Sequence, residues 1–282
     1  MKIKIFFVTY QEIETLNETL ESFSSTCDTS IFSEICIINN HSNFELSEKF
    51  EKITTVLHNE CRPDFSTGHL ARNWNQALIH GFKSLIDPDC DILIHCQNDV
   101  KFYDGWLDKV LKLHKTYDFI AIGAGDCFCS YTPEHVRKVG IWDERYWGIG
   151  FQEADYFLRS VYHNSNKSSI TDIGHTRMHN NLISRMSNPR GFDAYKKAGI
   201  CHMSNWEQGQ NSFHKESANN GHKPSLEIFK NKFNHCRPSS LNVANNFAKN
   251  NVDIYSGKLK TAMLYPYFEK DIPDRGLKNY VN

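Results

Sequence analysis

The sequence predicts an α/β fold: a mostly parallel sheet flanked by helices, followed by a loop-rich and helical C-terminal extension. Two observations predict the sheet and one predicts the extension. Up to about residue 175, short apolar runs alternate with segments whose apolar residues recur every three or four positions. Several of the apolar runs end in polar residues. After about residue 176, Asn, His, Lys and Ser dominate and the apolar periodicity weakens.

Strands and helices are expected in alternation along the first half of the chain. The expected strands are residues 2–8, 34–38, 53–57, the run that begins at Asp91, 119–123 and 169–173. Ile13, Leu16, Leu20 and Phe23 have helical spacing. Further helices are expected over 68–82, around 106–111, from Pro133 to Val139 and over 152–162. Thr132 before Pro133 is a typical helix start, with a capping hydroxyl followed by proline at the first helical position.

Composition places the chain among ordinary globular proteins and sets the expected domains. It has 282 residues, 40% of them hydrophobic, and a net charge of -1. Residues 1–180 are expected to carry the sheet, and 181–282 to form an extension that is either a subdomain or a partly disordered tail. No basic excess indicates a nucleic-acid partner. No run approaches the roughly twenty apolar residues of a membrane span, and the N-terminal run is too short for a signal peptide, so a cytoplasmic location is expected.

The nine cysteines are expected to be free. Their number is odd, their spacing is irregular and no C-x-x-C pair occurs. This pattern argues against a disulfide framework or a structural zinc site, and it favours buried thiols.

The most informative segment is Asp91–Val100, an apolar run that ends in Gln97, Asn98 and Asp99. A buried strand with this ending delivers polar groups to the carboxyl edge of the sheet, where ligands bind in open α/β folds. A carboxylate beside neutral oxygen donors suits a hard divalent cation that carries a phosphate ester. The alternative is that Asp99 only caps the following turn.

Two other strand ends and one helix start are expected to contribute to a ligand site. Thr9 and Tyr10 follow the first strand, and Asn39-Asn40-His41-Ser42 follows the second, where hydroxyls, carboxamides and a ring suit a nucleoside. Arg72 lies near the start of the 68–82 helix, a suitable environment for a diphosphate. Each of these signals has a structural alternative: strand-to-helix turns are often polar, and Arg72 alone would be an ordinary surface arginine.

A second group of carboxylates occurs in residues 142–155, where an aromatic, glycine-hinged loop enters a helix. Asp155 can pair with Arg159 one turn later, so Asp155 is the more structural carboxylate and Glu153 the freer one. A carboxylate in a partly desolvated pocket can have the basicity of a general base. Three tryptophans are candidates for stacking on a ring-shaped ligand: Trp106, Trp142 and Trp147. Either His175 or His179 could be a metal ligand beside Asp99.

Taken together, these segments resemble the GT-A glycosyltransferases, and among them the large inverting family-two group. The first strand with Tyr10 looks like the family's opening strand and nucleotide loop, and residues 39–42 look like its "D-N-x-S" turn. Residues 68–75 look like its "G-x-x-x-A-R-N" helix, and residues 97–100 look like its metal-binding "D-x-D". Residues 140–145 look like "G-x-F-D-E-R", and 152–155 with Arg159 look like "E-D-x-D" and its trailing arginine; 229–233 faintly resemble "F-x-x-K-W". The likeness covers residues 2–180 well and the remainder poorly.

The resemblance implies a Rossmann-like GT-A domain over 1–180 that transfers a sugar from a UDP-, GDP- or dTDP-linked donor to a glycan or other hydroxyl acceptor, with inversion. The enzyme would be a hexosyl- or deoxyhexosyltransferase, and 181–282 an acceptor-binding lid. Asp99 and His175 would hold Mn²⁺ or Mg²⁺, and Glu153 with Asp155 would be catalytic. The donor would contact the remaining site residues: Thr9, Tyr10, Asn40, Arg72, Gln97 and Asn98.

Departures from the family pattern keep other functions open. Gln97 and Asn98 replace acids of the "D-x-D", Asn40 stands where aspartate is often found, and Glu153 replaces an aspartate base. One alternative is a non-catalytic nucleotide- or glycan-binding relative with a degenerate metal site. A sugar-nucleotide pyrophosphorylase would have a similar sheet, but residues 9–12 lack its glycine-rich, basic loop. A retaining transferase also remains open.

Overall fold

The computed structural model of the chain describes residues 1–9, 13–40, 45–59, 68–123, 126–146, 151–164, 168–172, 200–202 and 225–228. The chain divides into two compact units. Unit 1 comprises Met1–Pro63, Cys90–Thr132 and Ser169–Trp206, and unit 2 comprises Asp64–Asp89, Pro133–Ser168 and Glu207–Asn282. The predicted boundary at residue 180 lies outside the described residues and stays a prediction.

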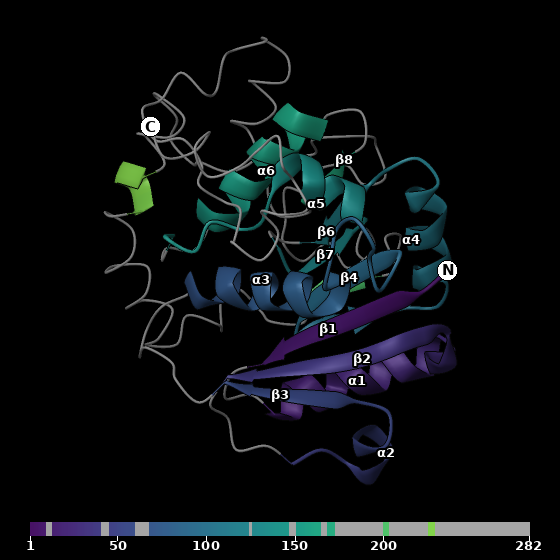
Figure 1. Cartoon of the computed structure of the whole chain (residues 1–282). Coiled ribbons are helices and arrows are strands. Elements are labelled where there is room, and N and C mark those ends of the chain that lie inside the picture. The colour runs from purple at the N-terminus through teal and green to yellow at the C-terminus, as the bar shows by residue number, and fades with distance from the viewer. Residues whose placement is uncertain are drawn as a thin grey trace. The chain divides into compact units, whose positions relative to one another are not determined.

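A seven-stranded sheet with the order β3-β2-β1-β4-β7-β6-β8 is the centre of unit 1 (Figure 1). Its strands are β1 (Ile3–Thr9), β2 (Phe32–Asn40), β3 (Thr55–Asn59), β4 (Ile92–Gln97), β6 (Phe119–Gly123), β7 (Phe128–Tyr131) and β8 (Ser168–Asp172). The pairs β1·β2, β1·β4 and β2·β3 are parallel, whereas β7 is antiparallel to both β4 and β6. The predicted α/β class with a mostly parallel sheet is confirmed.

The register brings the ends of the parallel strands to one edge. Thr9 is paired with Asn39, and Val8 with Gln97. A second, two-stranded sheet joins β5 (Val100–Phe102) to β9 (Ile200–His202), and neither of these strands was expected from the sequence. Unit 1 also contains the short helices η1 (Thr29–Ile31) and α2 (Glu48–Glu51).

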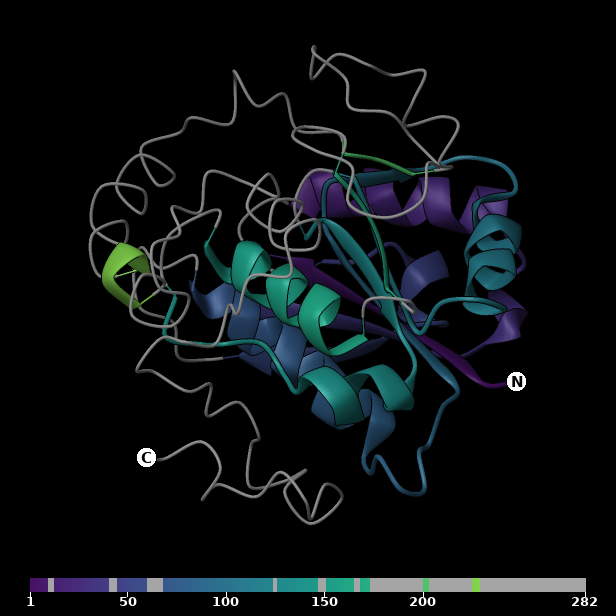
Figure 2. The ribbon, with the colours of Figure 1, turned by 90° about the horizontal axis from the view of Figure 1, so that it is seen from above.

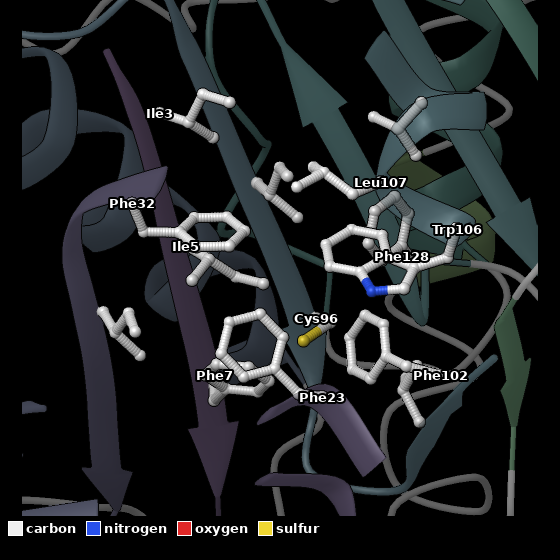
Figure 3. Close-up of a cluster of buried hydrophobic side chains, with 14 of the residues drawn as sticks. Ile3, Ile5, Phe7, Phe23, Phe32, Cys96, Phe102, Trp106, Leu107 and Phe128 are labelled. Carbon is white, nitrogen blue, oxygen red and sulfur yellow. The ribbon is translucent and has the colours of Figure 1, made fainter. Parts of the chain in front are cut away.

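One face of the sheet packs against α1 (Ile13–Thr26) and α4 (Trp106–His114), which lie on the same side of the strands (Figure 2). Alternate residues of β1 point to this face, where they meet an aromatic cluster (Figure 3). At its centre Phe23 contacts the rings of Phe7, Phe32 and Phe102 at centroid distances of 5.3, 5.2 and 5.6 Å. This packing fixes the strands whose ends carry the polar site.

Unit 2 contains three longer helices: α3 (Gly68–Phe82), α5 (Pro133–Val139) and α6 (Phe151–Asn164). Residues 225–228 form a further helical turn. Inside the unit, Trp142 stacks on Tyr156 with 4.2 Å between centroids and 5° between the planes. The predicted helix over 68–82 and the predicted start at Pro133 match the structure.

Two expectations from composition can be compared with the described residues. Six cysteines are free thiols, as predicted: Cys27, Cys36, Cys90, Cys96, Cys127 and Cys129. Within the described part of the chain, every helix is too short or too polar to cross a membrane.

Candidate functional site

The carboxyl ends of the parallel strands in unit 1 carry a row of polar side chains joined by hydrogen bonds. Asn59 Nδ2 donates to Asn40 Oδ1 at 3.0 Å, and Asn40 Nδ2 donates to the carbonyl oxygen of Thr9 at 3.3 Å. Asn98 Nδ2 donates to Thr9 Oγ1 at 3.3 Å. The row therefore runs from β3 across β2 and β1 to the turn after β4.

This row lies where the strand order makes a ligand site most favourable. The connections from β1 lead outward through β2 to β3, and the chain then returns to add β4 on the other side of β1. A reversal of this kind leaves a crevice outside the carboxyl ends of the strands. Thr9 and Asn40 are almost fully buried, so their hydrogen bonds to neighbours are needed to offset the loss of water.

The β4–β5 turn holds the carboxylate that the sequence singled out. Gln97 ends β4, and Asn98 and Asp99 form the turn, all three half-buried. The carbonyl of Asn98 accepts a hydrogen bond from Thr19 Oγ1 of α1, which ties the turn to the core helix. Burial, together with the neighbouring Cys127 and Asp99, raises the pKa of Cys96 well above its usual range. The Asp99 carboxyl group thus lies close enough to the end of β4 to influence the Cys96 thiol.

The oxygen donors of this turn have the chemistry that Mg²⁺ or Mn²⁺ accepts: one carboxylate with carboxamides beside it. Cations of this kind are often held by one or two carboxylates, with the remaining ligands supplied by substrate phosphates and water. Among the residues that the structure describes, no group of three or more His, Cys, Asp and Glu side chains could hold a metal on its own. Asp99 and the carboxamide oxygens of Gln97 and Asn98 are the donors that this turn could offer to such a cation.

In unit 2, the Asn75 side chain holds residues 142–144 through three hydrogen bonds. Its Nδ2 donates to the Trp142 carbonyl at 2.9 Å and to Glu144 Oε1 at 2.8 Å, while its Oδ1 accepts from the Trp142 amide at 2.8 Å. Arg72 Nε lies 3.4 Å from Glu144 Oε2, and the Arg72 side chain is 57% exposed. Arg72 is thus paired with Glu144 through Nε, and more than half of its side-chain surface is exposed.

The two α6 carboxylates have different environments. Glu153 is half-buried in the first turn of the helix. Asp155 is fully buried; its Oδ2 accepts from Arg159 Nε at 2.8 Å and its Oδ1 from the Tyr146 hydroxyl at 3.3 Å. Arg159 also donates to the carbonyls of Val139 and Ile141, both at 2.8 Å. The expected Asp155–Arg159 pair is confirmed.

Some expected site residues take other places. Trp106 and Trp142 have no exposed surface and pack within the protein, so the expectation that they stack on a sugar ring is wrong. Their aromatic surroundings, which suggested a binding surface in sequence, are core. Tyr10, His41, Trp147, His175 and His179 lie outside the described residues. Thr9, Asn40, Gln97, Asn98 and Asp99 share the edge of the unit 1 sheet, while Arg72, Glu153 and Asp155 belong to unit 2.

Sequence reasoning missed three participants. Asn59 extends the polar row, and Glu144 pairs with Arg72. Asp126, which is 4% exposed, accepts a 3.1 Å hydrogen bond from Gln97 Nε2. The sequence does indicate Asp126, because Gly123–Asp126 is a glycine-rich segment that ends in an acid directly after a predicted strand.

No protein-family model matches the chain, and no curated protein matches it in sequence. One similar solved structure is that of residues 1–349 of Staphylococcus aureus TarS, with 12% sequence identity and a TM-score of 0.43. A second is a mannosyltransferase of Pyrobaculum calidifontis in complex with GDP-Man and Mn²⁺, with 11% identity and a TM-score of 0.43. A third is glucosyl-3-phosphoglycerate synthase of Mycobacterium tuberculosis in complex with Mg²⁺ and UDP, with 12% identity and a TM-score of 0.42.

The matches cover 61%, 69% and 64% of this chain and 58%, 59% and 72% of those chains, respectively. The chain thus spans less than two thirds of the first two structures.

Proposed function

We propose that this protein is a glycosyltransferase that moves a sugar from a nucleotide-diphosphate donor to an acceptor hydroxyl, with inversion and with the help of a divalent cation. The observation that carries the proposal is the hydrogen-bonded row from Asn59 to Asn98 with Asp99 beside it, at the switch point of the sheet. Carboxamides and a hydroxyl suit a nucleoside, and a carboxylate suits a cation carrying a diphosphate.

In this proposal Asp99 is the charged ligand of Mn²⁺ or Mg²⁺, assisted by the oxygens of Gln97 and Asn98. The cation, when bound, offsets the negative charge that develops on the departing nucleotide. Asn40 and Thr9 orient the nucleoside. Arg72, whose side chain is 57% exposed, is the proposed partner of the diphosphate.

Glu153 is the proposed general base that takes the proton of the acceptor hydroxyl. Its half-buried place in the first turn of α6 supports this role, because partial desolvation raises the affinity of a carboxylate for a proton, as a general base requires. Asp155 has both oxygens in use, by Arg159 and Tyr146. We therefore propose that Asp155 contributes to catalysis by holding α6 to the 139–146 segment.

The first test is ligand-induced stabilisation. UDP-, GDP- and dTDP-sugars are added with and without Mn²⁺ to the wild type, to Asp99→Ala and to Asp108→Asn, which removes one exposed carboxylate on α4 as a charge-matched control. A ligand that binds the native state raises the melting temperature. One nucleotide class should stabilise the wild type and the control in a Mn²⁺-dependent manner and fail on Asp99→Ala. Absence of stabilisation by every donor would contradict the proposal.

The second test separates binding from chemistry. Glu153→Gln should lose about two to four orders of magnitude in turnover and keep donor affinity, as expected for removal of a general base. Glu134→Gln, which alters a half-exposed ion pair on α5, is the matched control and should keep full turnover. Full activity of Glu153→Gln would mean that another group is the base.

A non-catalytic binding protein is the second candidate, and one observation favours it: carboxamides occupy two of the three positions of the metal motif, at Gln97 and Asn98. Neutral donors bind a cation more weakly than carboxylates do. Nucleotide-sugar stabilisation without transfer or donor hydrolysis would establish this function.

A further inference from the structure

Asp126 is a buried carboxylate that no part of the proposed chemistry uses. It lies in the hairpin between β6 and β7, at the same edge as the end of β4, and is 4% exposed. The backbone brings it there: the Gln97 amide donates to the Cys127 carbonyl at 2.9 Å, which continues the β4·β7 ladder by one step. The side chains then meet, with 3.1 Å between Gln97 Nε2 and Asp126 Oδ1.

The chemistry of the two groups fixes the orientation of the Gln97 amide. An ionised carboxylate can only accept hydrogen bonds, so Gln97 must present Nε2 to Asp126. The carbonyl oxygen Oε1 is thereby turned to the other side of the amide group. Gln97 is the first residue of the Gln97–Asn98–Asp99 series, so its Oε1 is the atom that this position offers to a cation.

The burial of Asp126 affects how strongly a negative charge on it would act on the cation site. A carboxylate removed from water interacts with neighbouring charges through a lower effective dielectric than an exposed one does. A negative charge on Asp126 would also increase the electron density on Gln97 Oε1, because hydrogen-bonded groups polarise one another. Position 97 holds a carboxamide, and a carboxylate lies one hydrogen bond away from it, in the β6–β7 hairpin.

We propose that Asp126 is a positioning residue of the donor site: it orients the Gln97 carboxamide with Oε1 toward the cation–diphosphate and adds a second negative charge to that of Asp99. The inference rests on the proposed function, because it concerns the same site. It accounts for a metal motif that holds a single acid in sequence.

The test exchanges the two partners. Asp126→Asn removes the charge and lets the amides pair in either orientation. Gln97→Glu places two carboxylates in hydrogen-bond contact, where like charges resist joint ionisation. The double variant Gln97→Glu/Asp126→Asn restores one carboxylate and one carboxamide with their positions exchanged. Asp108→Asn is the control for loss of one charge.

The readout is the Kd of UDP, GDP or dTDP, whichever binds the wild type, measured by calorimetry with and without Mn²⁺ at a temperature where every variant is folded. Asp126→Asn is expected to weaken Mn²⁺-dependent binding at least tenfold, with a smaller change in Mn²⁺-free binding. Gln97→Glu is expected to weaken it too, and the exchanged pair to recover most of the loss. In transfer assays, Asp126→Asn should raise the donor KM more than it lowers kcat.

Two outcomes overturn the inference, and they are distinguishable. If the wild type binds none of these nucleotides, the proposed function fails and this inference fails with it. If the wild type binds and Asp126→Asn binds equally well, the proposed function stands and Asp126 has only a structural role. If Asp126→Asn does not fold, the double variant Gln97→Glu/Asp126→Asn, which keeps the hydrogen bond, provides the test. A folded double variant that has lost Mn²⁺-dependent binding would contradict the inference.

Discussion

The two compact units fill their interiors with different chemistry. Unit 1 is organised by an aromatic and aliphatic cluster around Phe23 and Trp106, and its polar edge is joined mainly by neutral carboxamides. Unit 2 has a full ion pair inside, Asp155–Arg159, with 0% and 1% of the side chains exposed. Apolar packing tolerates small changes in shape, whereas a buried ion pair has a high cost when one partner is lost. The fully buried Asp155–Arg159 pair should therefore be more sensitive to a single substitution than the apolar cluster around Phe23.

Arg159→Met should have the largest effect, with a loss of about 3–5 kcal/mol in the free energy of unfolding, because it leaves Asp155 buried without its cation. It also removes the donors to the Val139 and Ile141 carbonyls. The measurement is urea unfolding. Arg159→Met/Asp155→Leu is the matched control and should recover a substantial part of the loss; a single variant as stable as the wild type would show that water reaches Asp155.

Phe23→Ala tests the apolar side of the comparison. Removal of a fully buried ring should cost about 3–4 kcal/mol, through lost burial and the cavity left behind. Phe23→Leu, which keeps most of the volume, should cost roughly 1–2 kcal/mol. A loss for Phe23→Leu as large as that for Phe23→Ala would contradict the view that unit 1 depends on packing more than on a specific contact.

Acid should destabilise unit 1 through His114, the smallest of the three effects. Burial lowers the pKa of His114 to about 4, and its neutral ring contacts the Tyr117 carbonyl and Ser130. The unfolded chain binds this proton near pH 6.5, so stability falls as the pH drops from about 6.5 to about 4, by up to about 3 kcal/mol.

Unfolding free energies measured across this pH range check the prediction. The slope of stability against pH should be smaller in His114→Gln than in the wild type. An unchanged slope would assign the acid sensitivity to other groups, among them His95, whose pKa burial also lowers.

The features that the sequence predicts well are those with a local cause. The 68–82 helix has a complete apolar stripe, and Pro133 marks a helix start, so both match the structure. The meeting of Thr9, Asn40 and Asn98 follows from the parallel order of successive strands. What was missed depends on distant partners: β5 is only three residues long and pairs with β9, some hundred residues later. Asp126 reaches Gln97 only because β7 inserts antiparallel between β4 and β6, a pairing that no local pattern indicates.

Two cysteines, the buried Cys36 and the half-buried Cys27, can report on local opening of the protein. Burial raises the pKa of Cys36 to about 12 and that of Cys27 to about 11, so at neutral pH these thiols are protonated and react slowly with alkylating reagents. Cys36 lies within β2 and Cys27 directly follows α1. The rate at which Cys36 is alkylated in the native protein therefore measures how often β2 opens, whereas the rate at the half-buried Cys27 measures access to the end of α1.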